Sequence, residues 1–419
     1  MSTDTISRRD FLIGAGAVSA GVFLLNQEIL ADADAAPAPA GPPVGIGVIG
    51  LGLQGRDILT ALGNLTTASV VAVCDTYEPY AKRALEAAPK ATAHSDYKKL
   101  LEQQGVEAVI VATPSHLHRQ IVLDALAAGK HVYCESPIAS TVDEAKEIAK
   151  AGLAAKQVFQ AGLQLRSSPL RKHVFSFVKS GVPGAIGQGR AQWHKKQSWR
   201  RMAPTPEREA ELNWRLKKET SSGLLGEVGV HQIDVLNWYV NQLPVAVTAF
   251  GGIRKWTDGR DVADTVQAVF EYPEQLNVVF DATLVNSYEG AYECLYGSEA
   301  AIMLKGERGW MIKEVDSAML GWEPYAHKEK VGDETGIALV ANATKIIAQG
   351  KEPGKEDVDS KKDALYYAME EFAAAVRGGA KPEAGPQAGY AAAVCAIKAN
   401  EALLNGAKVT FQKEWFDLA

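Results

Sequence analysis

Three glycines follow a short apolar run in the pattern Gly-x-Gly-x-x-Gly. Gly50, Gly52 and Gly55 come directly after Val44–Ile49, and apolar residues recur at helical spacing from Arg56 onward. In a strand–loop–helix unit the first glycine permits a tight turn, and the second lets the backbone approach a pyrophosphate. The third lets the helix pack against the strand. The pattern therefore predicts a dinucleotide site, with the helix N-terminus facing the phosphates.

An acidic residue ends the second expected strand of this unit. Asp75 directly follows the apolar run 69–74. A carboxylate at this place accepts hydrogen bonds from the ribose hydroxyls of the adenosine and repels a 2′-phosphate, so the sequence favours NAD over NADP. The alternative interpretation is an ordinary solvated acid at the end of a strand.

Two further strand ends are expected to open onto the same crevice. Strands are predicted at 108–112 and 131–134, with a helix at about 117–128 between them. Loops at the carboxyl ends of parallel strands face the ligand. The residues that these loops bring near the cofactor are Thr113, Pro114, His116, Glu135 and Ser136. His116 and His118 have no third ligand nearby in sequence, so we expect hydrogen-bonded histidines and no metal site.

Length and composition indicate the class of protein that must position these residues. The chain has 419 residues, 47% hydrophobic and 22% charged, which predicts an ordinary globular protein of two or three domains. A net charge of −6 argues against a nucleic-acid partner. The four cysteines are widely scattered without metal-ligand spacing, and we expect free thiols; they are Cys74, Cys134, Cys294 and Cys395.

The N-terminal stretch Ser-Arg-Arg-Asp-Phe-Leu is typical of a twin-arginine export signal. Arg8 and Arg9 precede Phe11, Leu12 and a mild apolar run rich in glycine and alanine. We expect a signal over residues 1–35, a stiff linker over 36–43, and a periplasmic or otherwise exported protein. The twin-arginine machinery is then a partner, and an uncleaved signal would form a weak membrane anchor. The alternative is a chance basic pair before an ordinary signal or a disordered tail.

Several longer stretches resemble the Gfo/Idh/MocA family. They are VGIGVIGLGLQG, HSDYKKLLEQQGVEAVIVATPSHLH, GKHVYCESP and NWRLKKETSSGLLGEVGVHQIDVLNWY. The resemblance implies an α/β fold, with an N-terminal Rossmann domain over 44–165. The second domain, 166–419, is implied to be an α/β domain with a large, mostly antiparallel sheet that binds substrate and supports a homo-oligomer. The last helix and strand are expected to pack back on the Rossmann domain.

The resemblance also implies a nicotinamide cofactor and a sugar or polyol derivative as substrate. Asp75 favours NAD over NADP, and the expected export requires that the cofactor be loaded beforehand and stay tightly bound. Glu135 is implied to bind the nicotinamide ribose, and Trp214 and Arg215 to reach the cofactor from the second domain. The full set of expected cofactor-binding residues is Gly50, Gly52, Leu53, Gln54, Gly55, Asp75, Thr113, Pro114, His116, Glu135, Gln164, Trp214 and Arg215.

The same resemblance implies that His231 is the acid/base that takes the proton from a sugar hydroxyl. Glu227 lies four residues earlier, and on one helix the two side chains would share a face, so the carboxylate would orient the imidazole. Expected substrate-binding residues are Asp234, His194, Lys195 and Tyr288. The alternative for this helix is a plain amphipathic segment with a core-facing histidine.

One position departs from the family pattern. The family has Glu-Lys-Pro where this chain has Glu135-Ser136-Pro137, and a lysine there would stabilise charge that develops on the substrate oxygen. One interpretation is that a cation from elsewhere in the chain replaces it, and the candidates are His194, Lys195, Lys196 and Arg200. Otherwise the chemistry differs or the site is inactive. Three functions therefore stay open: an oxidoreductase, a redox-neutral glycoside-cleaving enzyme of the glycoside hydrolase family 109 type, and a silent sugar-binding module.

Overall fold

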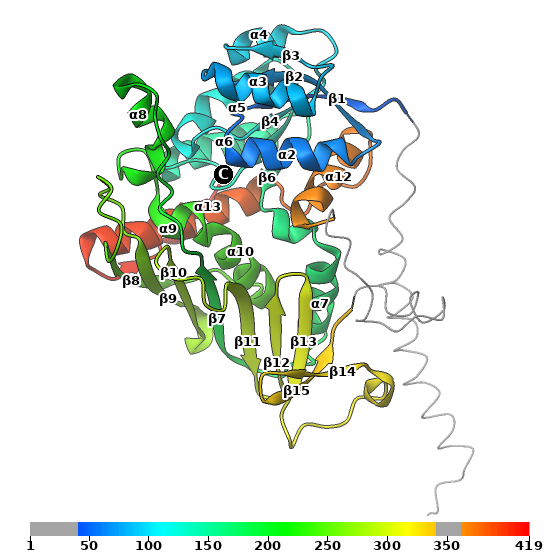
Figure 1. Cartoon of the computed structure of the whole chain (residues 1–419). Helices are drawn as coiled ribbons and strands as arrows, with labels where there is room; N and C mark the ends of the chain where they lie inside the picture. Colours follow the sequence, from blue (N-terminus) through cyan, green and yellow to red (C-terminus); the bar gives the residue numbers. More distant parts are fainter. Residues whose placement is uncertain (1–40, 341–361, 419) are drawn as a thin grey trace, which may run out of the picture.

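The computed structural model describes residues 41–340 and 362–418 (Figure 1). The predicted export signal at 1–35 lies outside the described residues. Among the helices that are described, none combines the length and apolarity needed to cross a lipid bilayer.

The first part of the chain forms a parallel sheet of six strands in the order β3-β2-β1-β4-β5-β6. Helices on both faces bury these strands, so β1 and β4 are apolar throughout rather than alternating. The order places β1 and β4 side by side at the point where the winding reverses, and ligands bind at such a point. The strands are β1 (Val44–Ile49), β2 (Ala68–Cys74), β3 (Thr92–His94), β4 (Ala108–Val111), β5 (His131–Glu135) and β6 (Phe159–Gly162).

The helices of this domain connect successive strands. Their N-terminal caps follow from the sequence: Asp96 caps α4 through the Lys98 amide, and Thr141 caps α6 through the Glu144 amide. The helices are α2 (Leu53–Gly63), α3 (Glu78–Ala87), α4 (Tyr97–Glu102), α5 (His118–Ala127) and α6 (Val142–Ala154).

The second part of the chain contains a ten-stranded sheet in the order β14-β15-β13-β12-β11-β7-β10-β9-β8-β16. All neighbours are antiparallel except β7 and β10. The predicted α/β fold with a large, mostly antiparallel second sheet is therefore confirmed. The strands are β7 (Ile186–His194), β8 (Ala246–Gly252), β9 (Thr265–Glu271), β10 (Asn277–Thr283), β11 (Ala291–Gly297), β12 (Ala300–Lys305), β13 (Arg308–Lys313), β14 (Lys328–Val331), β15 (Glu334–Ala338) and β16 (Val409–Thr410).

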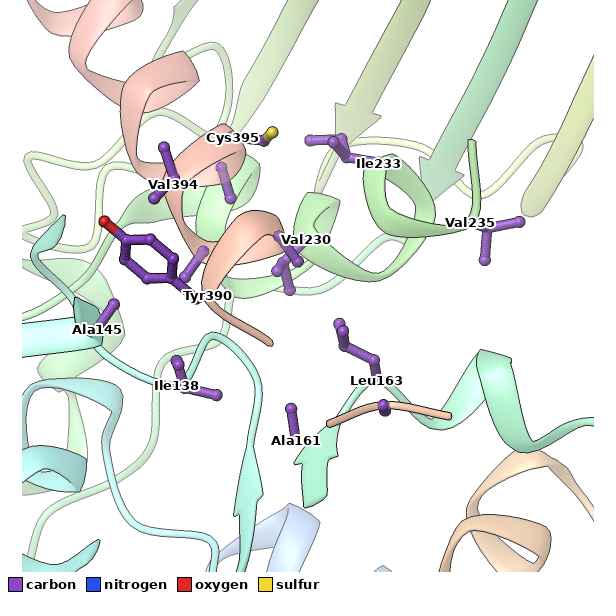
Figure 2. Packing of buried hydrophobic residues seen from close by; sticks show 14 of the residues in the cluster. Ile138, Ala145, Ala161, Leu163, Val230, Ile233, Val235, Tyr390, Val394 and Cys395 are labelled. Atoms are coloured by element: carbon purple, nitrogen blue, oxygen red, sulfur yellow. The ribbon is translucent and has the colours of Figure 1, made fainter. Parts of the chain in front are cut away.

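Helices fill the space between the two sheets (Figure 1). The long helix α13 contacts α6 and β6 of the first domain, and β8 and α10 of the second. Figure 2 shows Tyr390 and Val394 of α13 among Ile138 and Ala145 of the first domain and Val230 of α10. This shared core joins the two domains. The helices are α7 (Pro169–Lys179), α8 (Pro206–Leu212), α9 (Gly223–Glu227), α10 (Gly229–Val240), α12 (Ala364–Val376) and α13 (Pro386–Asn405).

Candidate active site

The glycine loop has the geometry that a pyrophosphate requires. Gly50 has φ +91°, and a Cβ there would lie 2.6 Å from the Ala112 backbone, so only glycine fits. A Cβ on Gly55 would lie 2.0 Å from the carbonyl oxygen of Gly50. Gly52, by contrast, faces open space, and no side chain caps the N-terminus of α2. The first amides of α2 therefore remain free to bind an anion.

Asp75 lies beside this loop. Its Oδ2 accepts a hydrogen bond from the Leu51 amide at 2.7 Å, and its Oδ1 accepts one from the Tyr77 amide at 2.8 Å. Burial raises the pKa of this carboxyl, and the two amides oppose the rise. Because a carboxylate has about four acceptor positions, Asp75 can bind ribose hydroxyls without losing these amides.

Glu135 ends β5 on the other side of the winding reversal. Its Oε1 accepts a hydrogen bond from the Gln54 side chain at 2.9 Å, and its Oε2 accepts one from the Ser136 amide at 3.3 Å. Gly162 leaves room for this carboxylate, since a Cβ there would lie 2.7 Å from Glu135 Oε2. Burial raises the pKa of Glu135 to about 7. The residue is thus a buried acceptor at the place predicted for the nicotinamide ribose.

Buried polar atoms without partners gather among the predicted site residues. Such atoms are costly in a folded protein unless a ligand or water supplies the missing hydrogen bond. Within the described part of the chain, those that belong to predicted site residues or to Ser136 are Thr113 Oγ1, Ser136 Oγ, Gln164 Oε1, Arg215 Nε and His231 Nδ1. Thr113, Ser136 and Gln164 follow β4, β5 and β6, and the other two residues belong to the second domain. Together with the open loop at Gly52, these atoms fit a bound dinucleotide and its substrate.

His231 lies in the first turn of α10. Its Nδ1 is one of the unpartnered atoms, and the residue is only partly buried. Desolvation, helped by the charge of Arg215, lowers the pKa of His231 to about 4. The imidazole is therefore neutral at neutral pH, as a general base must be.

The predicted pairing of Glu227 with His231 is wrong. The helix breaks at Val228, with φ −126° and ψ −49°, so the two residues belong to α9 and α10 and do not share one helix face. Glu227 Oε1 instead accepts hydrogen bonds from serine hydroxyls of both domains. The donors are Ser115 at 3.0 Å, Ser222 at 3.2 Å and Ser221 at 3.4 Å. Sequence reasoning missed Ser115, although it directly follows Pro114 in a loop predicted to face the crevice.

Asp234 is also engaged differently from the prediction. Its two oxygens accept hydrogen bonds from the guanidinium of Arg166 at 2.7 and 2.9 Å, and only 3% of its side chain is exposed. Arg166 in turn lies over the Trp238 ring. The carboxylate is therefore held in a buried ion pair, and its role in binding substrate hydroxyls stays a prediction.

His194 points away from α10, contrary to the substrate-binding prediction. Phe280 of β10 contacts the position of Gly229 in α10, and Ala191 pairs with Phe280 on that face. Because side chains alternate along a strand, His194 lies on the opposite face, where its Nε2 lies 2.6 Å from Asp281 Oδ1. The register of β7, which the sequence does not state, decides this placement.

The other two predicted substrate-binding residues are exposed. Tyr288 is 77% exposed, and its carbonyl oxygen lies 3.2 Å from His194 Nδ1. Lys195 is exposed at the end of β7. Its charge acts on Asp57 of α2 and opposes the rise in pKa that burial causes there.

The histidines near the crevice are held by hydrogen bonds. His118 lies between the carbonyl oxygens of Thr113 and Pro137, and burial lowers its pKa to about 4. His116 lies 3.1 Å from the Thr220 carbonyl oxygen and beside the Trp214 ring. No group of three or more metal-binding side chains occurs among the described residues, and all four cysteines are buried and free.

Comparison with known families agrees with this geometry. Residues 44–163 match the family model described as an oxidoreductase family with an NAD-binding Rossmann fold. Residues 172–312 match the GFO/IDH/MocA C-terminal domain. The chain belongs to the Gfo/Idh/MocA oxidoreductase family, and its first domain is an NAD-binding Rossmann domain.

Individual relatives match parts of the chain. Levoglucosan dehydrogenase from Pseudarthrobacter phenanthrenivorans is 30% identical over 149 residues, which cover 35% of this chain and 36% of the relative. An alpha-N-acetylgalactosaminidase from Shewanella oneidensis is 28% identical over 229 residues, covering 46% of this chain and 50% of the relative. The chain thus matches about a third to a half of the length of these curated relatives.

Solved structures share the fold over most of the chain. Levoglucosan dehydrogenase in complex with NADH and levoglucosan superposes with a TM-score of 0.71 and 20% identity, covering 88% of this chain and 100% of that one. An oxidoreductase domain protein from Kribbella flavida gives a TM-score of 0.72 and 20% identity, covering 89% and 100%. At this identity the likeness concerns the fold.

Proposed function

We propose that the protein is an NAD-dependent oxidoreductase that removes hydride from a sugar or polyol derivative. The observation that carries the proposal is His231, a neutral imidazole with an unpartnered nitrogen, which follows helix α9 where Ser115 of the loop after β4 donates a hydrogen bond to Glu227. The similarity to levoglucosan dehydrogenase supports a carbohydrate substrate.

The chain's own residues divide the work in this reaction. Bound NAD supplies the hydride acceptor. The free amides of α2 bind the pyrophosphate, Asp75 binds the adenosine ribose, and Glu135 binds the nicotinamide ribose. His231 accepts the proton of the substrate hydroxyl while the carbon of that hydroxyl loses hydride, so a secondary alcohol becomes a ketone. We propose NAD rather than NADP because the Asp75 carboxylate repels a 2′-phosphate.

Oxidation of sugars by the cofactor-loaded protein tests this function. The protein is loaded with NAD and mixed with anhydrosugars, aldoses and polyols, and NADH is followed by its near-ultraviolet absorbance. The proposal expects NADH to form with at least one substrate, at no more than one equivalent per chain if the cofactor stays bound. Absence of NADH with every class of sugar, in a protein that binds NADH, overturns the proposal.

An exported form of this protein would need to keep its cofactor. We propose export on the basis of Arg8 and Arg9, and no free NAD is supplied outside the cytoplasm. The cofactor would then be loaded before export, and hydride would return to a second substrate in each cycle. Denaturing the purified exported protein and measuring nucleotide in the supernatant tests this: about one NAD(H) per chain is expected, and an empty protein contradicts it.

A redox-neutral glycoside-cleaving reaction is the second candidate. Ser136 in place of the family lysine and the similarity to an alpha-N-acetylgalactosaminidase favour it. In that reaction the transient ketone acidifies the neighbouring C–H, the glycosidic bond eliminates, water adds, and hydride returns. Phenol release from aryl glycosides without net NADH supports this candidate. Sugar binding with neither product would indicate a silent sugar-binding module.

A homo-oligomer through the open face of the ten-stranded sheet also belongs to the proposal. The face exposes apolar and aromatic side chains, among them Val269 and Tyr296. Such a surface commonly forms a protein interface. Sedimentation analysis is expected to give a species larger than one chain, and a monomer at all concentrations contradicts this part.

A further inference from the structure

The loop after β5 lacks the positive charge that a hydroxyl-oxidising site needs. When a hydroxyl loses its proton, negative charge develops on the oxygen, and a fixed cation or donor nearby lowers the barrier. Ser136 offers only a neutral hydroxyl, and its Oγ is buried without a hydrogen-bond partner. A cation from another part of the chain must therefore act on this space if the proposed reaction occurs.

Of the four cations considered from the sequence, two are bound to other partners and two are exposed. His194 lies on the opposite face of the sheet and binds Asp281. Arg200 is exposed and bound to Glu209 and to the Asp258 carbonyl oxygen. Lys195 and Lys196 are exposed in the segment after β7. His194 and Arg200 thus have partners elsewhere, and neither exposed lysine is held in place by a buried contact.

Arg215 is the cation whose charge acts on both sides of the crevice. It lowers the pKa of His231, and it opposes the rise in the pKa of Glu135, the residue before Ser136. The Arg215 Nε is buried without a hydrogen-bond partner, while 36% of the side chain is exposed. The guanidinium is therefore within electrostatic range of both residues and open to a ligand.

Two indole rings and a carboxylate fix this guanidinium. Its central carbon lies 5.0 Å from the Trp214 ring centroid and 5.7 Å from that of Trp199, which are cation–π distances. Trp199 has φ +67°, a conformation that is costly for a bulky residue and is found where the surrounding structure imposes it. Arg215 Nε also lies 3.8 Å from Glu227 Oε2. The serine hydroxyls that hold the other oxygen of Glu227 complete this support.

We infer that Arg215, held between Trp199 and Trp214, supplies the positive charge beside the reacting oxygen that the family lysine supplies elsewhere. Glu227 is then a positioning residue for Arg215 and does not orient His231. This inference rests on the proposed function, because it assigns a role within that reaction. It also explains how a serine after Glu135 is compatible with an active site.

The experiment compares three variants with the unaltered chain: Arg215→Met, Ser136→Lys in the Arg215→Met background, and the control Arg254→Met. Arg254 is exposed in the segment after β8, and Arg254→Met removes the same charge as Arg215→Met. The measurements are NADH affinity by fluorescence titration, the rate of hydride transfer from the substrate found above, and NMR titration of the His231 imidazole.

For Arg215→Met the inference expects hydride transfer to fall about 10²- to 10³-fold, the usual effect of losing one oxyanion-stabilising group. NADH affinity should change by less than about threefold, a shift of well under 1 kcal/mol, because the inference assigns Arg215 to the reacting oxygen in place of the cofactor contact expected from the sequence. The pKa of His231 should rise, because a repelling charge is gone. Adding Ser136→Lys should raise the rate of hydride transfer at least about tenfold above that of Arg215→Met alone. The rate of Arg254→Met should match that of the unaltered chain.

Two results would overturn the inference. Arg215 is a cofactor ligand if NADH affinity falls by the same factor as the rate and lysine at position 136 restores nothing. An unchanged His231 titration in Arg215→Met removes the electrostatic link itself, and this measurement needs no substrate. A chain that binds NADH but oxidises no sugar contradicts the proposed function and not the inference itself. In that case the His231 titration still tests whether the Arg215 charge acts on His231.

Discussion

The Gln54 side chain donates a hydrogen bond to Glu135 at 2.9 Å, joining the first turn of α2 to the end of β5. These two elements border the crevice where the winding of the Rossmann sheet reverses. The bond keeps a carboxylate buried beside the glycine loop, where a nicotinamide ribose can replace or share the amide donor. A buried acid held in this way should leave a signature in the stability of the protein.

Glu135 should make the cofactor-free protein less stable as pH rises. Burial raises its pKa from 4.5 to about 7, so the folded state holds a proton that the unfolded state releases above pH 4.5. Its stabilising contribution is therefore complete below pH 4.5 and is lost as pH rises toward about 7. Between about pH 5 and about pH 8, the melting temperature should fall less for Glu135→Gln than for the unaltered chain.

A matched control for this experiment is Glu78→Gln, because Glu78 is fully exposed and carries a surface ion pair with Lys82. Its melting curve should follow the unaltered chain across the same range. Parallel curves for Glu135→Gln and the unaltered chain would show that the carboxyl titrates normally, against this account.

Gly52 and Gly50 should respond oppositely to alanine. A Cβ on Gly52 meets open space in the protein, so Gly52→Ala should keep its melting temperature but lose NADH affinity, by more than about tenfold, since the methyl occupies the pyrophosphate position. Gly50→Ala combines φ +91° with a contact of 2.6 Å to backbone, and should be destabilised. Calorimetry and NADH titration separate the two effects. Full NADH affinity in Gly52→Ala would place the phosphates elsewhere.

Asp75→Asn should weaken NAD binding and reduce the preference over NADP. The amide keeps one acceptor oxygen for the loop but loses the charge that binds ribose hydroxyls and repels a 2′-phosphate. We expect about a tenfold or greater loss of NAD affinity, as for a charge-assisted hydrogen bond worth about 1.5–3 kcal/mol. Dissociation constants for both nucleotides measure this, and an unchanged ratio argues against Asp75 as the selector.

His231 should remain an active base in mildly acidic solution. Because desolvation and Arg215 lower its pKa to about 4, the imidazole is still neutral at pH 5, and kcat/KM should decline only toward pH 4. An unperturbed histidine would place that decline near pH 6.5, as the ordinary histidine pKa is about 6.5. A pH profile with NAD-saturated protein measures it, and a decline near the ordinary value contradicts the environment described for His231.

Local pattern was sufficient to predict the first domain. Gly50, Gly52 and Gly55 lie in one loop, and the apolar strands around them are continuous in sequence, so spacing alone indicated the unit and the place of Asp75. The alternation of short strands likewise predicted the second sheet. Each of these features depends on residues close together in the chain.

The features that sequence reasoning did not predict depend on helix breaks, strand register and contacts between residues far apart in the chain. Glu227 and His231 have helical spacing, but a kink at Val228 between two glycines separates them. The face of the sheet on which the His194 side chain lies is set by the strand register that pairs His194 with Thr283. The position of Arg215 between Trp199 and Trp214 depends on a loop that folds back with a left-handed residue. No local pattern contains such information.

The most direct test of the account is hydride transfer by the unaltered protein and by His231→Ala, each loaded with NAD and given the same sugar panel. His327→Ala is a control that removes a histidine directly before β14, the edge strand of the ten-stranded sheet. We predict that His231→Ala binds NADH normally but forms NADH from sugar at least about 10²-fold more slowly, the range for loss of a general base, while His327→Ala is unaffected. Equal rates in His231→Ala and the unaltered protein would contradict the central assignment.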